Sequence, residues 1–130
     1  MAKTPVTLEV KDYTTREVLK VSYEFEKSTD NEGQVNGIAR GGLITVRLKP
    51  LNDGTPDMMA WMVDSNLKKD GSITFLETTS GNKMKSIDFK EAFCIHYAEH
   101  WADGEASYEE IIISCKSITF GNITYEYDWK

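Results

Sequence analysis

Apolar and polar residues alternate along most of this chain, and a period of two is the pattern of β-strands with one buried face. The alternating apolar positions are, in order, Val6, Leu8 and Val10; Leu19, Val21, Tyr23 and Phe25; Ile44, Val46 and Leu48; Ile73 and Phe75; Ile87, Phe89, Phe93, Ile95 and Tyr97; Ile111, Ile113 and Cys115; and Ile123, Tyr125, Tyr127 and Trp129. Turn-forming pairs such as Asp103-Gly104 and Gly121-Asn122 separate these sets. We therefore expect an all-β fold, with seven or eight antiparallel strands in a closed or nearly closed barrel.

The strand pattern over residues 85–100 is too long for a straight strand in a small barrel. At about 3.3 Å per residue it would extend for roughly 50 Å. Glu91 interrupts the alternation of its apolar residues. We expect this strand to bend at a β-bulge or to project beyond the body of the barrel.

One helix is expected, over residues 55–66, inserted between two strands. Thr55 is a suitable N-cap, and Pro56 fits the first helical position. The apolar residues of this segment cover most of its circumference at about 100° per residue, and they are Met58, Met59, Trp61, Met62 and Val63. So wide an apolar surface indicates a second partner, which is either more of the helix's own barrel or another subunit.

A polar segment at residues 28–39, STDNEGQVNGIA, separates the second and third strands. About a dozen residues is long for a connection in a compact domain. The segment therefore either takes part in an interaction or is simply a mobile surface loop.

Composition and charge exclude several functional classes. The chain has 15 Lys and Arg residues against 21 Asp and Glu residues, so its net charge of −6 opposes binding to nucleic-acid phosphates. The N-terminal residues lack the apolar run of a signal peptide, and no apolar stretch approaches the ~18 residues of a membrane span. We expect a single domain over residues 1–130, made in the cytoplasm, with no nucleic-acid partner and no membrane insertion.

Catalysis or metal binding would need a set of residues that we do not find. His96 and His100 would lie about 13 Å apart on a strand, too far to share one metal ion. Cys94, His96 and Cys115 could supply zinc ligands, but the tight paired spacing of structural zinc sites is missing. As a nucleophile pair, Cys94 and His96 lack a third residue that orients the histidine. We therefore expect both cysteines to be reduced and buried, and no catalytic residue, metal site or cofactor.

Three acidic residues in the C-terminal part of the chain are expected to have no catalytic or metal-binding role. Glu105, Glu109 and Glu110 fit a solvated face of the molecule.

The order of several short motifs along the chain is distinctive. A polar loop ends in Arg40-Gly41-Gly42 and is followed by Trp61-Met62 in the expected helix, the Gly71–Phe75 strand GSITF, Lys83-Met84-Lys85, Glu91-Ala92-Phe93, Tyr97-Ala98-Glu99 and Ile113-Ser114. This order resembles the tube protein of type VI secretion systems, the haemolysin-coregulated protein (Hcp) or TssD family, in the form found in Bacteroidetes. The resemblance extends from Leu8 to Trp129 and depends on the order and spacing of the motifs.

The resemblance implies a small β-barrel with one helix that assembles into a hexameric ring. Rings of this family stack into the inner tube of a contractile machine, whose sheath, spike and baseplate proteins are then partners, and the tube lumen carries effector proteins. It further implies a structural, non-enzymatic subunit that is exported through its own apparatus without a signal peptide. The apolar helix and the missing catalytic set agree with this expectation.

We assign the assembly contacts to two segments on this basis. Met58 is predicted to face its own barrel, and the predicted contacts between neighbouring subunits are Trp61, Met62 and Met59. The residues predicted to stack one ring on the next are Asn31, Glu32, Gly33 and Arg40.

Two other classes of protein share this pattern. A small-ligand barrel of the lipocalin type would also alternate, but the large side chains of Phe25, Phe75, Phe89 and Phe93 are expected to point inward and fill the barrel. Tail-tube proteins of phages and of extracellular contractile particles share the tube architecture and are the main alternative.

Overall fold

The computed structural model describes residues 6–27, 29–35, 42–51, 54–77 and 79–126. In these ranges the chain forms the strands β1 (Val6–Val10), β2 (Arg16–Tyr23), β3 (Leu43–Leu48), β4 (Lys69–Leu76), β5 (Lys83–His100), β6 (Tyr108–Phe120) and β7 (Ile123–Glu126), and the helix α1 (Asp57–Val63). Arg40, Tyr127 and Trp129, which entered the predictions above, lie outside the described residues.

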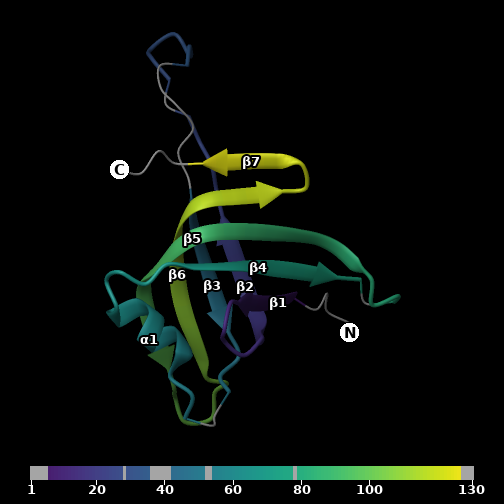
Figure 1. The fold of residues 1–130 in the computed structure, drawn as a ribbon, viewed down its shortest axis with the longest axis vertical. Helices are drawn as coiled ribbons and strands as arrows, with labels where there is room; N and C mark the ends of the chain where they lie inside the picture. Colours follow the sequence, from purple (N-terminus) through teal and green to yellow (C-terminus); the bar gives the residue numbers. More distant parts are fainter. Residues whose placement is uncertain (1–5, 28, 36–41, 52–53, 78, 127–130) are drawn as a thin grey trace.

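Six of the strands close into an antiparallel barrel (Figure 1). Their order is β3-β2-β1-β4-β5-β6, and pairing of β3 with β6 closes the circle, for example through Ile44 and Ile113. β7 lies outside this circle and pairs with residues 117–120 of β6, beyond the residues 109–114 that pair with β3. The expected all-β barrel with one inserted helix is confirmed.

The long strand β5 bends at two irregularities, as the bulge prediction required. Glu91 has a φ of 50°, and the register with β4 shifts at this point. A second shift, relative to β6, falls between Cys94 and His96. Each extra residue exchanges the inward and outward faces of the strand, because side chains alternate with a period of two.

The residues that β5 buries therefore differ from those expected by simple alternation. Ile87 and Phe89 are buried as predicted, but beyond Glu91 the buried residues are Ala92 and Cys94. The prediction that Ile95 faces inward is wrong, since its side chain is 52% exposed. Phe93, also predicted inward, is only partly buried, and the ammonium group of Lys68 lies over its ring.

A similar shift in β2 corrects the prediction for Leu19. The register with β3 changes between Val18 and Lys20, so Val18 is buried and Leu19 is 52% exposed. Alternation resumes beyond this point with the partly buried Val21 and Tyr23.

The helix α1 packs against β5 and is shorter than the expected segment at both ends. Its N-cap is Pro56, so the prediction of Thr55 as the cap is wrong. Met58 and Trp61 are fully buried, which confirms that Met58 faces its own barrel. The Trp61 indole stacks on the Phe89 ring at 6.5 Å, and its Nε1 donates a hydrogen bond to the Ala92 carbonyl oxygen at 3.2 Å.

The chain leaves the barrel after β2 and forms an extended arm, which we define as residues 24–27 and 29–35. Figure 1 shows the arm rising well away from the barrel along the longest axis of the molecule. Near its tip, Thr29 forms a β-bridge with Val35.

Candidate assembly surfaces

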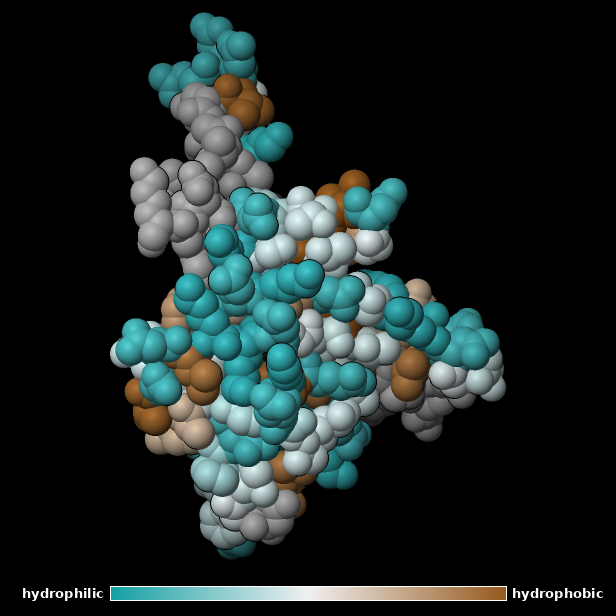
Figure 2. Space-filling model, viewed as in Figure 1, coloured by the Kyte–Doolittle hydropathy of each residue, from teal (hydrophilic) through white to brown (hydrophobic). Residues whose placement is uncertain are grey.

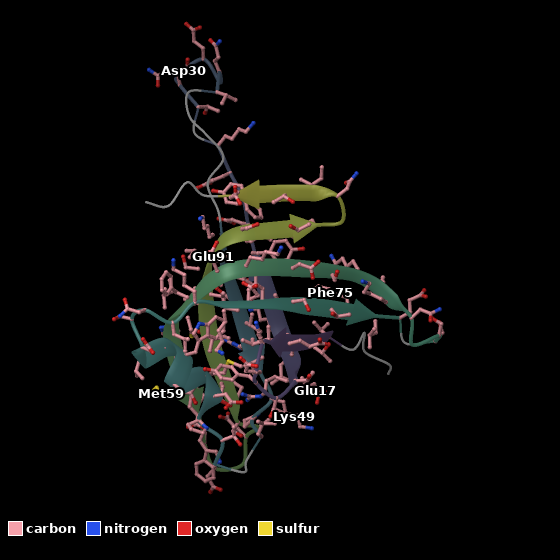
Figure 3. The ribbon with its side chains drawn as sticks, viewed as in Figure 1. Glu17, Asp30, Lys49, Met59, Phe75 and Glu91 are labelled. Carbon is pink, nitrogen blue, oxygen red and sulfur yellow. The ribbon has the colours of Figure 1, made fainter. Side chains whose placement is uncertain are left out.

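The helix α1 divides its apolar residues between the core and the surface. Met59 is 43% exposed and Val63 is 64% exposed, whereas Met62 packs partly against the core. Figure 3 shows Met59 at the outer side of the helix, and Figure 2 shows hydrophobic atoms at the surface on this side of the molecule. Met59, Met62 and Val63 therefore form one half-exposed apolar surface.

Trp61 takes a different position from the one assigned to it. Its side chain has no exposed surface within the single chain, so direct contact with another subunit is not available to it. Its hydrogen bond and its stacking partner both belong to its own barrel. Trp61 instead holds the helix against β5 and so presents Met59 and Val63 outward.

The strand β7 offers a second surface. Among the described strands it pairs with β6 alone, so its other edge has no neighbouring strand there. Ile123, at the start of β7, is 65% exposed. An open strand edge presents backbone donors and acceptors to which a strand from another chain can pair.

The arm tip contains three of the four residues predicted to stack rings. Asn31, Glu32 and Gly33 are exposed there, beside Asp30, which Figure 3 places at the far end of the arm. Asp30 Oδ1 accepts hydrogen bonds from the backbone N–H groups of Glu32 at 2.9 Å and Gln34 at 3.0 Å. Gly33 has a φ of 82°, a conformation that favours glycine. The tip is thus a turn with its own hydrogen bonds.

Other exposed apolar residues were not singled out from the sequence. Leu43 is 50% exposed on β3, and Trp101 is 79% exposed in the connection between β5 and β6. The only sequence signal for Trp101 was its position just before the Asp103-Gly104 turn.

A buried ionic cluster near one end of the barrel was also missed. The Arg16 guanidinium donates hydrogen bonds to Glu109 Oε1 and to the Lys49 carbonyl oxygen, and the Tyr97 hydroxyl donates to Glu109 Oε2 at 3.0 Å. Glu109 is 7% exposed, so its assignment to a solvated face is wrong. Burial and the hydrogen bond to Glu109 raise the pKa of Tyr97 to about 12. The cluster ties β2, β5 and β6 together.

The histidines lie beside an outward-facing stack of side chains. Tyr108 lies against His100, with ring centroids 4.8 Å apart, and against the Arg47 guanidinium at 4.5 Å. Arg47 Nε also donates to Glu110 Oε2 at 3.0 Å. His96 Nε2 lies 4.0 Å from Glu110 Oε1. These contacts join β3, β6 and β5 on the outer wall of the barrel.

Both cysteines are unbridged and buried, as predicted. Burial raises the pKa of the Cys94 thiol to about 11 and that of the Cys115 thiol to about 12. Thiols with raised pKa values are poor nucleophiles at neutral pH. Within the described ranges, no three His, Cys, Asp or Glu side chains come together as a metal site.

The described residues include no helix of the length and hydrophobicity that crossing a membrane requires.

A surface groove of about 340 Å³ lies between the β1–β2 connection and β4, and Tyr13, Asp70 and Gly71 are among the residues that line it. Gly71 is required there, because an added Cβ would lie 2.4 Å from the Glu9 carbonyl oxygen and 2.6 Å from the Phe89 ring.

The chain is similar to a group of solved proteins. Hcp1 from Flavobacterium johnsoniae is 27% identical, with a TM-score of 0.87 over 95% of this chain and 99% of that one. A mutant Hcp1 from E. coli EAEC 042 is 14% identical, with a TM-score of 0.79 over 98% of this chain and 100% of that one. The secreted protein Hcp3 from Pseudomonas aeruginosa is 10% identical, with a TM-score of 0.66 over 98% and 99%. At such low identity, the similarities to the last two proteins show only that the fold is shared.

No curated protein sequence matches the chain significantly. The similarity to the Flavobacterium protein confirms the expected Bacteroidetes-like form. A family model, described as Hemolysin coregulated protein Hcp (TssD), matches residues 2–130. The chain therefore belongs to the Hcp (TssD) family of type VI secretion proteins.

Proposed function

We propose that this chain is a structural subunit of the inner tube of a type VI secretion system. Its copies form hexameric rings, the rings stack into a tube, and a contractile sheath propels the tube together with effector proteins in its lumen. The match of the family model to residues 2–130 is the observation that carries this proposal.

A filled barrel supports a structural role over that of a small-ligand carrier. The barrel interior is occupied by large side chains with at most 1% exposure, which include Leu8, Ile44, Met58, Trp61, Phe89 and Ile111. A ligand-binding barrel requires a roomy interior instead.

We assign the lateral contact between subunits to the open edge of β7 and to Met59, Met62 and Val63 on α1. A ring joins two different surfaces of each subunit head to tail, so the chain must present two such surfaces. An open strand edge and an exposed apolar surface are features of such contacts. Trp61 contributes by positioning the helix from within.

We assign stacking of rings to the arm, through Asn31, Glu32 and Gly33 at its tip and Arg40 further along the chain. The internal hydrogen bonds of Asp30 limit the conformational entropy that the tip loses on binding.

We also infer that the subunit has no catalytic activity. It is made in the cytoplasm and leaves through the secretion apparatus, with sheath, spike and baseplate proteins as partners. Raised thiol pKa values at Cys94 and Cys115 support a purely structural role for both residues.

Negative-stain images and light scattering of the purified protein test the proposal. We expect rings with a wide central hole and a mass of six subunits. A strictly monomeric species of 14.7 kDa at high micromolar concentration would contradict it. Phage and extracellular-particle tubes would form similar rings, so loss of export on deletion of the sheath gene in the source cells separates those alternatives.

A further inference from the structure

β7 and the base of the arm lie outside the closed circle of strands. β7 pairs with β6 alone among the described strands, and the arm begins directly after β2. Among the described strands, neither β7 nor the arm is held between two barrel strands. Figure 1 shows both at the same end of the molecule.

Four aromatic rings, which we call the aromatic cluster, join these two elements. They are Tyr23 at the end of β2, Phe25 at the base of the arm, Phe120 at the end of β6 and Tyr125 on β7. Phe25 packs on Tyr125 with ring centroids 4.8 Å apart at 64°, and on Phe120 at 5.7 Å and 82°. Tyr23 packs on Phe120 at 5.2 Å and 40°. Such edge-on and tilted arrangements are favourable for aromatic pairs.

The cluster is anchored on one side and open on the other. Tyr23, Phe25 and Phe120 pack against the hydrophobic core of the barrel. Tyr125 belongs to the strand whose outer edge has no neighbouring strand in the described chain. A continuous series of ring contacts therefore runs from the open edge of β7 to the base of the arm.

We propose that the aromatic cluster positions the arm, and that pairing of a strand with β7 is coupled to the orientation of the arm through Tyr125 and Phe25. A strand bound to β7 restricts the motion of the Tyr125 side chain, and Tyr125 in turn restricts the motion of the Phe25 ring. The arm base that carries Phe25 leads to the tip, whose turn is held by the hydrogen bonds of Asp30. Such coupling is reciprocal, so a fixed arm also favours pairing at β7.

This inference rests on the proposed function, since the neighbouring subunit of a ring supplies the strand at β7. It predicts an order of assembly. Subunits in a closed ring hold their arms in one orientation and stack readily, whereas single subunits sample several orientations.

Distances between paired spin labels test the inference. The labels are attached at Asn31→Cys on the arm tip and Glu17→Cys on the barrel, while the native thiols of Cys94 and Cys115 are buried. In single subunits, Phe25→Ala should widen the distribution of label distances at least twofold. Ile95→Ala, an exposed apolar position on β5 outside both the aromatic cluster and the proposed subunit contact, is the matched control and should leave the width unchanged. Ring formation should narrow the distribution in the unchanged chain but not in Phe25→Ala.

An unchanged width in Phe25→Ala, or equal narrowing of both proteins in rings, would overturn the proposal. If Phe25→Ala does not fold, Phe25→Leu keeps an apolar side chain, loses the aromatic contacts and decides the same question. The measurement in single subunits tests the positioning of the arm independently of the proposed function. Absence of rings would refute the proposed function, whereas the width comparison alone decides whether Phe25 positions the arm.

Discussion

Substitution of Trp61 by alanine should destabilise the subunit itself. The indole is fully buried, stacks on Phe89 and donates a hydrogen bond to the Ala92 carbonyl oxygen. Truncation of a buried aromatic side chain to alanine costs about 3–5 kcal/mol, and a carbonyl left without its donor adds about 1 kcal/mol. We therefore expect a loss of roughly 4–6 kcal/mol, which is a large part of the stability of a domain of this size.

The expected shift in melting temperature follows from the chain length. An unfolding entropy of about 2.1 cal/mol/K per residue over 130 residues amounts to roughly 0.27 kcal/mol/K. A loss of about 4 kcal/mol then lowers the melting temperature by about 15 °C. Circular dichroism during heating and urea unfolding measure this, at concentrations below those at which rings form, because assembly would raise the apparent stability.

Two variants separate the contribution of the indole hydrogen bond from that of ring packing, and the core face of the helix from its exposed face. Trp61→Phe retains a ring against Phe89 but removes the N–H donor, so its loss should be intermediate. Met59→Ala, on the exposed side of the same helix, should change subunit stability by less than about 1 kcal/mol and weaken ring formation instead. A Trp61→Ala subunit that melts normally but no longer forms rings would refute the core assignment and restore Trp61 to the interface.

Three further predictions concern the arm, the thiols and the ionic cluster. Deletion of residues 30–34 should leave single rings intact and shorten or abolish tubes in electron micrographs; tubes of normal length would remove the arm from the stacking contact. Cys94 and Cys115 should resist a thiol reagent at pH 8 in the folded protein and bind no zinc by elemental analysis, and alanine at either position should cost about 1 kcal/mol; rapid labelling would contradict their burial. Because the pKa of Tyr97 is raised to about 12 in the folded state, its contribution to stability is complete below about pH 10 and is lost as the pH rises through 12. Tyr97→Phe should therefore reduce the loss of stability over that alkaline range, and an unchanged slope would show that burial and the Glu109 contact do not raise the pKa of Tyr97.

Alternation in the sequence predicted the barrel because most strands bury one continuous face. In β3, Ile44, Val46 and Leu48 are all fully buried, as their period of two required. In β5 the same rule succeeded before Glu91 and failed after it. Apolar residues occupy both faces of β5 beyond Glu91, so the sequence pattern alone does not reveal where the extra residues shift the register. The bend itself was predictable from the length of the strand, but its effect on Phe93 and Ile95 was not.

The buried ionic cluster could not be derived from local sequence. Glu109 is separated from Arg16 by 93 positions, and its burial depends on the barrel bringing β2 beside β3, β3 beside β6 and β6 beside β5. A carboxylate becomes buried when a cation and a hydroxyl compensate its lost hydration. Arg16 and Tyr97 supply both groups: Tyr97 comes from the adjacent strand β5, and Arg16 from the far part of the chain.

The division of α1 into a core face and a surface face was available from helical periodicity. Met58 and Trp61 are three residues apart and so lie on the same side of a helix, and assigning Met58 to the barrel already implied the same for Trp61. Met59, Met62 and Val63 follow the same spacing on another side, where two of the three are exposed. The apolar surplus of the helix thus corresponds to two separate surfaces. A contact with another subunit on α1 is expected at Met59 and Val63, with Trp61 behind them as the residue that keeps the helix in place.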